Sequence, residues 1–338
     1  MVFAPTGNIV EYKGYDDDGK DPIKPWFQAA IDLGDHIGIR FGHIIPDSEE
    51  PQWVYLSHAD YDGIGGFADI LQERGFDVRP LPTIPHSAPR SWWPFLRSMH
   101  LFLTPRERVT WKKRFGQSAP PRHDKAPKSV AWHVFDRETT DKIVAACKDK
   151  QYTVNSYLLS HLGEAVYPDA ADDTRAIGWM VPVNLRGKVN RRRDSENHVS
   201  FVRISLERKD SPERVHRKIY RELERGEHWA NWNAYTATRI LPLKIKRAMV
   251  KADRVTSRYT VGVFSNIGVW NRDGEFDLEG DWVFAPPAMR FFMIAAGCVT
   301  WNGRLSLCLH IHPEISADPA DSREWVTAWV ASITSDIE

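Results

Sequence analysis

The chain has 338 residues, of which 42% are hydrophobic and 27% charged, and its 45 lysines and arginines balance 45 aspartates and glutamates. This length allows two domains or two joined lobes, and the balanced charge removes the usual argument for a nucleic-acid partner, which requires a basic excess. No apolar run approaches the ~18 residues of a membrane-spanning helix, and the first residues lack the basic and apolar regions of a signal peptide. Cys147, Cys298 and Cys308 are widely spaced, so we expect reduced, buried thiols in a cytoplasmic protein.

In the first part of the chain, short apolar runs alternate with helical patterns. We expect strands at 7–12, 37–45 and 52–58, and helices at 25–33, 66–74 and about 105–115. Gly75 stands where a helix commonly ends in a left-handed residue. The polar, Pro-rich run 117–127 is interpreted as a linker, which predicts an N-terminal lobe over 1–125 and a C-terminal lobe over 126–338.

The second part of the chain repeats this alternation. We expect strands at 130–135, 179–185, 198–206, 260–264, 289–300 and 305–311, and helices at 136–148, 153–167, from 211 and at 322–337. Ser211 and Pro212 are typical first residues of a helix, and Asn302-Gly303 is typical of a hairpin turn. The pattern as a whole predicts an α/β fold built as two-layer sandwiches.

One short motif indicates chemistry. The run 57–63, Ser-His-Ala-Asp-Tyr-Asp-Gly, places His58 at the end of an apolar strand, with Asp62 and Gly63 opening the following helix. A histidine at such a turn projects from the edge of a sheet, and its pKa near neutrality suits a general base. Glycine permits a tight turn and the close approach of a ligand. Taken alone, the motif at 57–63 is also compatible with a surface turn in which Asp62 merely caps a helix.

The motif resembles the His-His-x-x-x-Asp-Gly signature of the chloramphenicol acetyltransferase superfamily, which includes condensation domains and wax ester synthases. Four further segments resemble that superfamily in matching order, and they lie at 153–159, 181–186, 196–201 and 264–268. The resemblance spans roughly residues 53–311. It implies two lobes with the active site in a tunnel between them.

The resemblance also implies roles for individual residues. His58 would deprotonate an alcohol or amine that attacks a thioester, and Asp62 would pair with Arg186 to hold the turn. Ser265 and Asn266 would lie near the reacting centre and stabilise an oxyanion; the alternative is that they satisfy backbone groups at a strand end. The expected donor is an acyl-CoA or an acyl-carrier thioester, with no bound cofactor and no metal.

The same resemblance implies a direct transfer without an acyl-enzyme, and the sequence contains no Gly-x-Ser-x-Gly nucleophile elbow. The expected partners are a small-molecule or lipid-like acceptor and an acyl carrier protein. Two alternatives stay open: a non-catalytic binding or scaffold protein of the same fold, and a condensation-type enzyme that uses carrier-bound substrates.

Two departures from the signature matter. Ser57 stands where the first histidine of the signature usually lies, and only 57 residues precede His58. An abbreviated N-terminal lobe predicts an open site or a homo-oligomer in which a second copy supplies the missing wall. The aromatic stretch 92–102 is a candidate contact for that copy, although packing within the core or between lobes is the first interpretation.

Two other groups of residues have ordinary explanations. His310 and His312 alternate along a predicted strand and could suit a metal, but no third ligand is near, which favours polar strand residues. The run 191–193, three arginines, could hold a phosphate of coenzyme A or face a carrier protein, whereas a solvated loop is the simpler interpretation.

Overall fold

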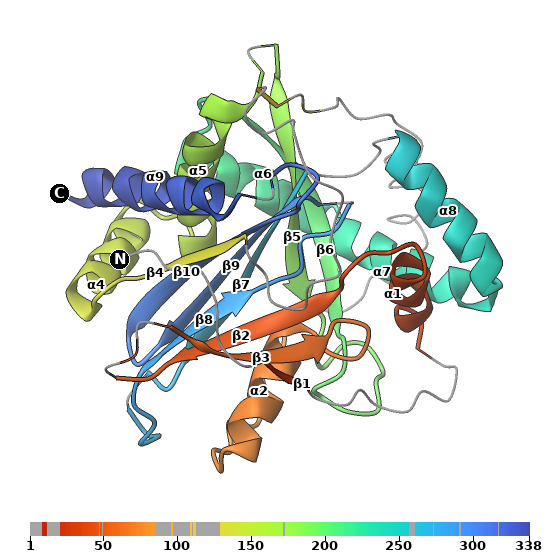
Figure 1. The fold of residues 1–338 in the computed structure, drawn as a ribbon, viewed down its shortest axis with the longest axis horizontal. Helices are drawn as coiled ribbons and strands as arrows, with labels where there is room; N and C mark the ends of the chain where they lie inside the picture. The colour runs from red at the N-terminus through yellow and green to blue at the C-terminus, as the bar shows by residue number, and fades with distance from the viewer. Residues whose placement is uncertain are drawn as a thin grey trace.

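A computed structural model describes residues 9–11, 21–46, 48, 50–84, 96, 109, 111–112, 129–171, 173–256, 261–272, 274–290, 292–316 and 318–338. Within these residues the chain forms two β-sheets with helices packed against them, which confirms the predicted α/β class (Figure 1).

The first sheet has four strands in the order β1-β3-β2-β8. Its strands are β1 (Ile9–Glu11), β2 (Gly38–Ile44), β3 (Gln52–Ser57) and β8 (Asp281–Ala285). β1 pairs parallel with β3, and the other two pairings are antiparallel. Helix α2 (Gly63–Glu73) covers one face, where Phe41 and Phe67 are fully buried. Helix α1 (Lys24–Ile31) precedes β2.

Strand β8 comes from the second part of the chain, although it completes the first sheet. The sheets therefore do not divide at residue 125, as two consecutive lobes would. The predicted linker 117–127 lies outside the described residues, and so does the stretch 92–102 apart from Leu96, so the boundary between lobes stays a prediction.

The second sheet has six strands in the order β4-β10-β9-β7-β5-β6. Its strands are β4 (Val130–Val134), β5 (Ala176–Asn184), β6 (Val199–Glu207), β7 (Gly262–Trp270), β9 (Ile294–Trp301) and β10 (Arg304–Ile311). β7 lies parallel to β5 and β9, and the remaining pairings are antiparallel. Asn302 and Gly303, with φ of 50° and 73°, form the predicted turn between β9 and β10.

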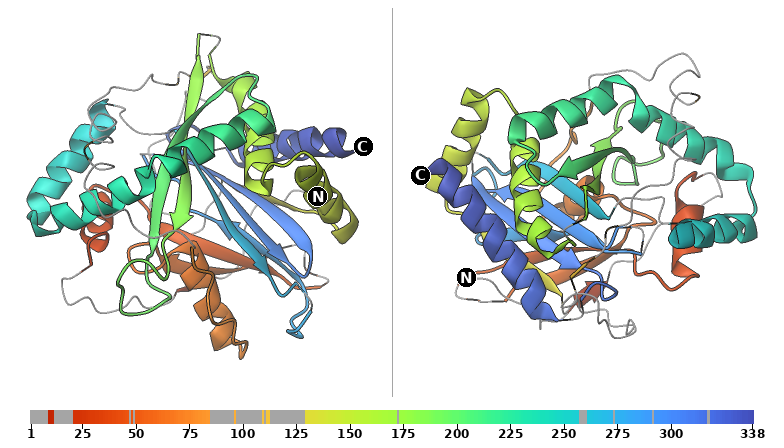
Figure 2. Two further views of the ribbon diagram at one scale, coloured as in Figure 1. Left: turned by 180° about the vertical axis from the view of Figure 1, so that it is seen from behind. Right: turned by 90° about the horizontal axis from the view of Figure 1, so that it is seen from above.

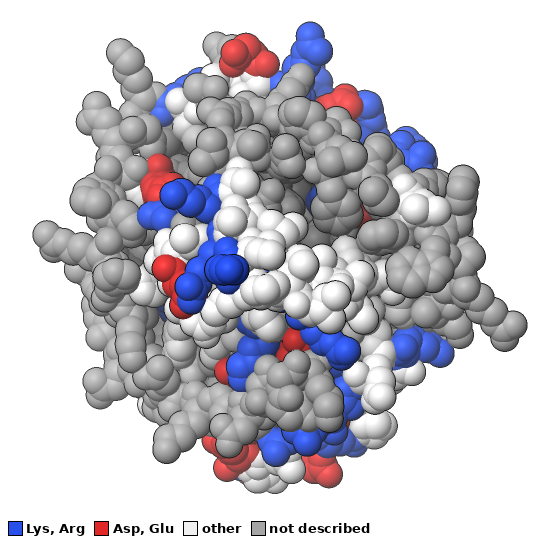
Figure 3. Space-filling model, turned by 90° about the vertical axis from the view of Figure 1, so that its right-hand side faces the viewer, with Lys and Arg blue, Asp and Glu red and all other residues white. Residues whose placement is uncertain are grey.

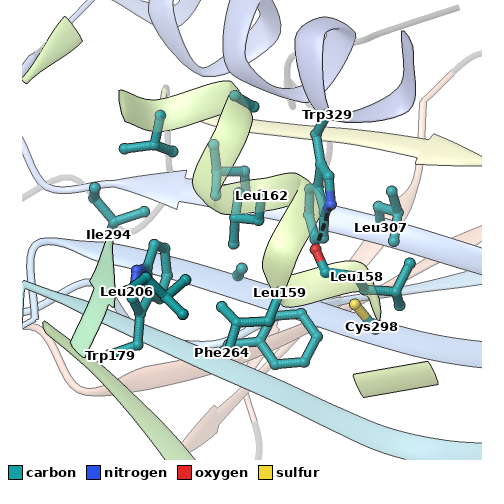
Figure 4. Packing of buried hydrophobic residues seen from close by; sticks show 14 of the residues in the cluster. Leu158, Leu159, Leu162, Trp179, Leu206, Phe264, Ile294, Cys298, Leu307 and Trp329 are labelled. Atoms are coloured by element: carbon teal, nitrogen blue, oxygen red, sulfur yellow. Dashed lines mark hydrogen bonds between the residues drawn. The ribbon is translucent and has the colours of Figure 1, made fainter. Parts of the chain in front are cut away.

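Four helices pack on the second sheet around its main core, namely α4 (Arg137–Asp149), α5 (Val154–Val166), α6 (Pro212–Glu224) and α9 (Pro319–Ile337). Ser211 caps α6 as predicted, because its hydroxyl accepts from the amide of Arg214. Figure 4 shows Leu158 and Leu162 of α5 packed against sheet residues, with Trp329 of α9 donating to the Leu158 carbonyl at 2.8 Å.

The remaining helices lie toward the opposite edge of the molecule from α4 and α9 (Figures 1 and 2). They are α7 (Glu227–Ala237), which packs on β6, and α8 (Leu243–Thr256), which packs on α1. Two short 3₁₀ turns, η1 (Tyr167–Asp169) and η2 (Thr238–Ile240), follow α5 and α7.

Some predicted elements were wrong or missing. In the predicted helix at 105–115, the described residues Val109, Trp111 and Lys112 are not helical, and Trp111 forms an antiparallel bridge with Ala170 instead. The sequence patterns did not predict α7, α8 or β8, and β7 continues well past residue 264.

The cysteines, the helices and the surface charges bear on the expectations from composition. All three cysteines are buried free thiols, as predicted. Within the described ranges, no helix is long and apolar enough to cross a membrane. On the face in Figure 3, basic and acidic side chains lie side by side among the coloured residues.

The two sheets contact each other through a small apolar cluster. It contains Trp53 of β3 and Ala285 of β8 from the first sheet, together with Trp132 of β4 and Cys308 of β10 from the second. Trp53 is the second residue of β3, and the other end of that strand leads into the predicted catalytic turn.

Candidate active site

His58 follows β3 directly, and its backbone is held on two sides. Its amide donates to the Ile37 carbonyl at 3.1 Å, and the Asn197 side-chain amide donates to its carbonyl at 3.1 Å. The half-buried imidazole lies against the Phe27 ring of α1, with 4.6 Å between ring centroids. The turn, α1 and the segment before β6 therefore converge on this residue.

The hydrogen bond of the imidazole fixes which of its nitrogens can act as a base. Nδ1 lies 2.8 Å from the Tyr61 carbonyl. A carbonyl only accepts, so Nδ1 must carry the proton and donate, which leaves the lone pair on Nε2. Burial lowers the pKa of His58, against the opposing effects of the Tyr61 carbonyl and the Asp62 charge. The side chain is consequently neutral at pH 7, the form that accepts a proton.

Asp62 anchors the turn from below and is fully buried. Oδ1 accepts from the Gly65 amide at 2.8 Å and from Arg186 Nη2 at 2.7 Å, and Oδ2 accepts from the His198 amide at 2.8 Å. The carboxylate thus caps α2 and also forms the predicted salt bridge with Arg186. Both of its oxygens are used inside the fold, so Asp62 positions the turn rather than exchanging protons with a substrate.

Arg186 is buried and ties the segment 194–196 to Asp62. Its Nε donates to the Asp194 carbonyl at 2.6 Å, and its Nη2 reaches the Glu196 carbonyl at 3.2 Å. Asn184 orients the guanidinium by accepting from Nη1 at 3.1 Å. Arg186 is therefore not a surface charge, because its side chain is 2% exposed.

Gly63 is needed for packing. A Cβ added there would lie 2.7 Å from a methyl of Ile267 and 2.9 Å from the Phe284 ring. The glycine lets the first turn of α2 approach β7 and β8, and the expectation that it also allows a ligand to approach stays a prediction. Gly65 is tighter still, since an added Cβ would lie 2.2 Å from the backbone oxygen of Ser195.

Ser265 and Asn266 lie within β7, opposite Gly297 and Cys298 of β9. Asn266 Nδ2 donates to Asn155 Oδ1 at 2.8 Å, and its Oδ1 accepts from the Gly268 amide at 2.9 Å, next to an irregularity in the strand. These contacts join two of the segments that resemble the superfamily, around residues 155 and 266. Among the described residues, no hydrogen bond joins either side chain to His58, so their oxyanion role stays a prediction.

The sequence patterns gave no role to Asn197, which is buried and holds the His58 backbone. It lies in the segment 196–201, which was identified from the sequence only as one of the segments that resemble the superfamily in matching order. A bridge between Tyr61 and Glu196 brings that segment beside the turn, and this long-range pairing leaves no local pattern in the sequence.

Arg191 and His310 are held by contacts within the fold. Arg191 forms ion pairs with Asp21 and Glu196, and its side chain is 5% exposed. Arg192 and Arg193 are exposed and lie outside helices and strands, in agreement with a solvated loop. His310 accepts from the Ala288 amide at 3.1 Å, inside the structure. In the part of the chain that the structure describes, no three metal-ligating side chains form a group.

The chain is similar to known proteins in its structure rather than in its sequence. No protein-family model matches the sequence, and no curated protein has a matching sequence. The epimerization domain of the third module of tyrocidine synthetase B aligns over 97% of this chain and 79% of its own, with TM-score 0.52 and 12% identity. Trichothecene 15-O-acetyltransferase from Fusarium sporotrichioides aligns over 96% and 76%, with TM-score 0.57 and 12% identity.

The EpoB NRPS cyclization-docking bidomain from Sorangium cellulosum aligns over 98% of this chain and 70% of its own, with TM-score 0.53 and 13% identity. These likenesses confirm the predicted fold. The chain has the two-lobed, chloramphenicol acetyltransferase-like fold of condensation-type and acyltransferase proteins.

Proposed function

We propose that this protein is an acyltransferase that moves an acyl group from a thioester to an alcohol or amine, with His58 as its general base. The observation that carries the proposal is the Nδ1–Tyr61 carbonyl bond of 2.8 Å, which leaves a neutral imidazole with its lone pair on Nε2. A base needs its acceptor nitrogen directed at the substrate, and this backbone contact supplies that orientation.

The proposed reaction uses one proton and one leaving group. Nε2 of His58 takes the proton of the acceptor as its oxygen or nitrogen attacks the thioester carbonyl carbon. The tetrahedral intermediate then collapses, the carbon–sulfur bond breaks, and the imidazolium returns the proton to the departing thiolate. The products are an ester or amide and a free thiol, without an acyl-enzyme.

Other residues support these steps without exchanging protons. Asp62 and Arg186 hold the turn through their buried ion pair of 2.7 Å. One N–H of Asn266 is bonded to Asn155, and we propose that the other N–H, or the Ser265 hydroxyl, stabilises the negative oxygen of the intermediate. Preorganised donors of this kind lower barriers because they need no rearrangement during the reaction.

The proposed donors are coenzyme A thioesters and carrier-protein thioesters. Trichothecene 15-O-acetyltransferase is named for acetyl transfer to oxygen, whereas the epimerization domain and the cyclization bidomain belong to synthetases. The acceptor is a small molecule or a lipid-like alcohol or amine. A non-catalytic scaffold is disfavoured by the oriented, neutral imidazole of His58.

The test measures thiol release from acyl-CoA and acyl-carrier thioesters across a panel of alcohols and amines. His58→Ala should lower the rate by roughly 10²–10⁴. His133→Ala is the matched control, because that half-buried histidine lies on β4 and its ring contacts Phe135, outside the site. Equal rates for wild type and His58→Ala, with both folded, would refute the proposal.

A further inference from the structure

Arg40 is a buried cation that the proposed reaction does not use. It lies in β2 and is 3% exposed. Among the residues that the structure describes, its Nε and Nη1 atoms are buried and have no hydrogen-bond partner. Buried donors are nearly always satisfied, because an unsatisfied charged group in the interior forfeits its hydration without replacement.

The register of the first sheet shows where this side chain points. Arg40 pairs directly with Tyr55 of β3 and with Ala285 of β8. Residues directly opposite each other share a face of the sheet, and Ala285 packs with Trp132 and Cys308 of the second sheet. Arg40 therefore enters the layer between the two sheets.

The titratable neighbours across that layer are neutral. Burial raises the pKa of the Cys308 thiol and lowers that of His310 far below its usual value, and the Arg40 charge lowers both. Burial also lowers the pKa of Arg40 to about 10, so the guanidinium stays charged at pH 7. The guanidinium carbon lies 5.8 Å from the centroid of the Tyr55 ring. None of these groups supplies a negative charge at neutral pH.

The same layer leads to the catalytic turn. Tyr55, opposite Arg40, precedes His58 by three residues of nearly extended chain, or about 10 Å. On the other side, His310 pairs with Ala295 of β9, which shares an apolar cluster with Ala59 of the turn. Arg40 thus lies on the inner side of the sheet that presents His58.

We propose that Arg40 binds a carboxylate carried by the substrate, about 10 Å from the group that reacts at His58. A carboxylate matches the planar guanidinium and would satisfy donors that the fold leaves empty. That the bound carboxylate belongs to a substrate rests on the proposed acyl transfer. The anion site itself is inferred from Arg40 and its surroundings alone. The carboxylate belongs to the donor or to the acceptor, and the experiment separates the two.

Calorimetric titration tests this with pairs of probes that differ in one group. The donor arm compares adipyl-pantetheine with hexanoyl-pantetheine, and the acceptor arm compares 6-hydroxyhexanoate with 1-hexanol. In one arm, wild-type protein should bind the carboxylate probe about tenfold or more tightly than the neutral probe. Arg40→Met should abolish that preference, and Arg40→Lys should keep part of it because the charge remains.

The melting temperature gives a second reading. Arg40→Met should melt at the same temperature as wild type or higher, because it removes an unpaired buried charge and keeps the volume. Absence of preference in both arms, or a preference that survives Arg40→Met, would overturn the site. Binding requires no turnover, so transfer without carboxylate preference refutes the anion site alone, whereas preference without transfer refutes only the proposed function.

Discussion

Replacing Arg186 by methionine is the sharpest test of how the catalytic turn is held. The substitution keeps much of the side-chain volume but removes the partner of Asp62 and the donors to the Asp194 and Glu196 carbonyls. Asp62 is 0% exposed, so its charge would keep only two backbone amides in a site closed to water. Breaking a buried pair in this way costs about 3–5 kcal/mol, against a typical stability of roughly 5–15 kcal/mol.

Urea unfolding at pH 7 measures this cost directly. Lys142→Met is the control, because Lys142 pairs with Glu138 at 2.8 Å on the exposed face of α4 and its loss should change little. Adding Asp62→Asn to Arg186→Met removes the stranded charge, so the double variant should lose less than the sum of the single changes. A change in Arg186→Met under about 1 kcal/mol, or strict additivity, would show that the pair does not hold the turn.

Further predictions concern the same turn and the assembly. Because burial holds the pKa of His58 below its usual 6.5, the fraction of neutral base rises with pH through that lowered value, so kcat/KM should be flat above about pH 7 and fall in acid; a rate that still climbs through pH 8 would contradict this. Asn197→Ala should lower kcat in protein that remains folded, since it frees the His58 backbone; a loss of kcat that only follows a loss of folded protein would point to a purely structural role. Gly65→Ala should unfold or melt far below wild type, because its Cβ would lie 2.2 Å from the Ser195 oxygen; normal melting would refute that packing. The homo-oligomer predicted from the sequence stays a prediction, and light scattering should give a mass above that of one chain.

Local signals in the sequence predicted the elements that carry them. The cap at Ser211 and the turn at Asn302-Gly303 were confirmed because each depends on residues a few positions apart. Helix α7 was missed because its first turns bury Glu227, Trp229 and Trp232 together, which erases the one-sided periodicity of a surface helix. Strand β8 has five residues, too few for periodicity to distinguish strand from helix.

The candidate site was predicted through an ordered set of motifs. Asp62 and Arg186 are 124 residues apart, so no periodicity connects them, and only the resemblance paired them. The roles of Asn197 and the Tyr61 carbonyl were missed, because backbone contacts between distant segments follow from the fold rather than from residue type. Arg40 was missed for a similar reason, since one arginine in an apolar strand reveals neither its neighbours nor its lack of partners.

The position of β8 beside β2, at the edge of the first sheet, has a consequence for how the protein is made. During synthesis, β2 and β3 emerge early, but β2 keeps an open edge until residues 281–285 leave the ribosome, because Arg40 pairs with Ala285 about 245 positions later. An open edge beside an apolar face invites pairing with other chains. Nascent or truncated chains that end before β8 should therefore aggregate or recruit chaperones, and the first sheet should reach its native stability only after residues 281–285 have been released.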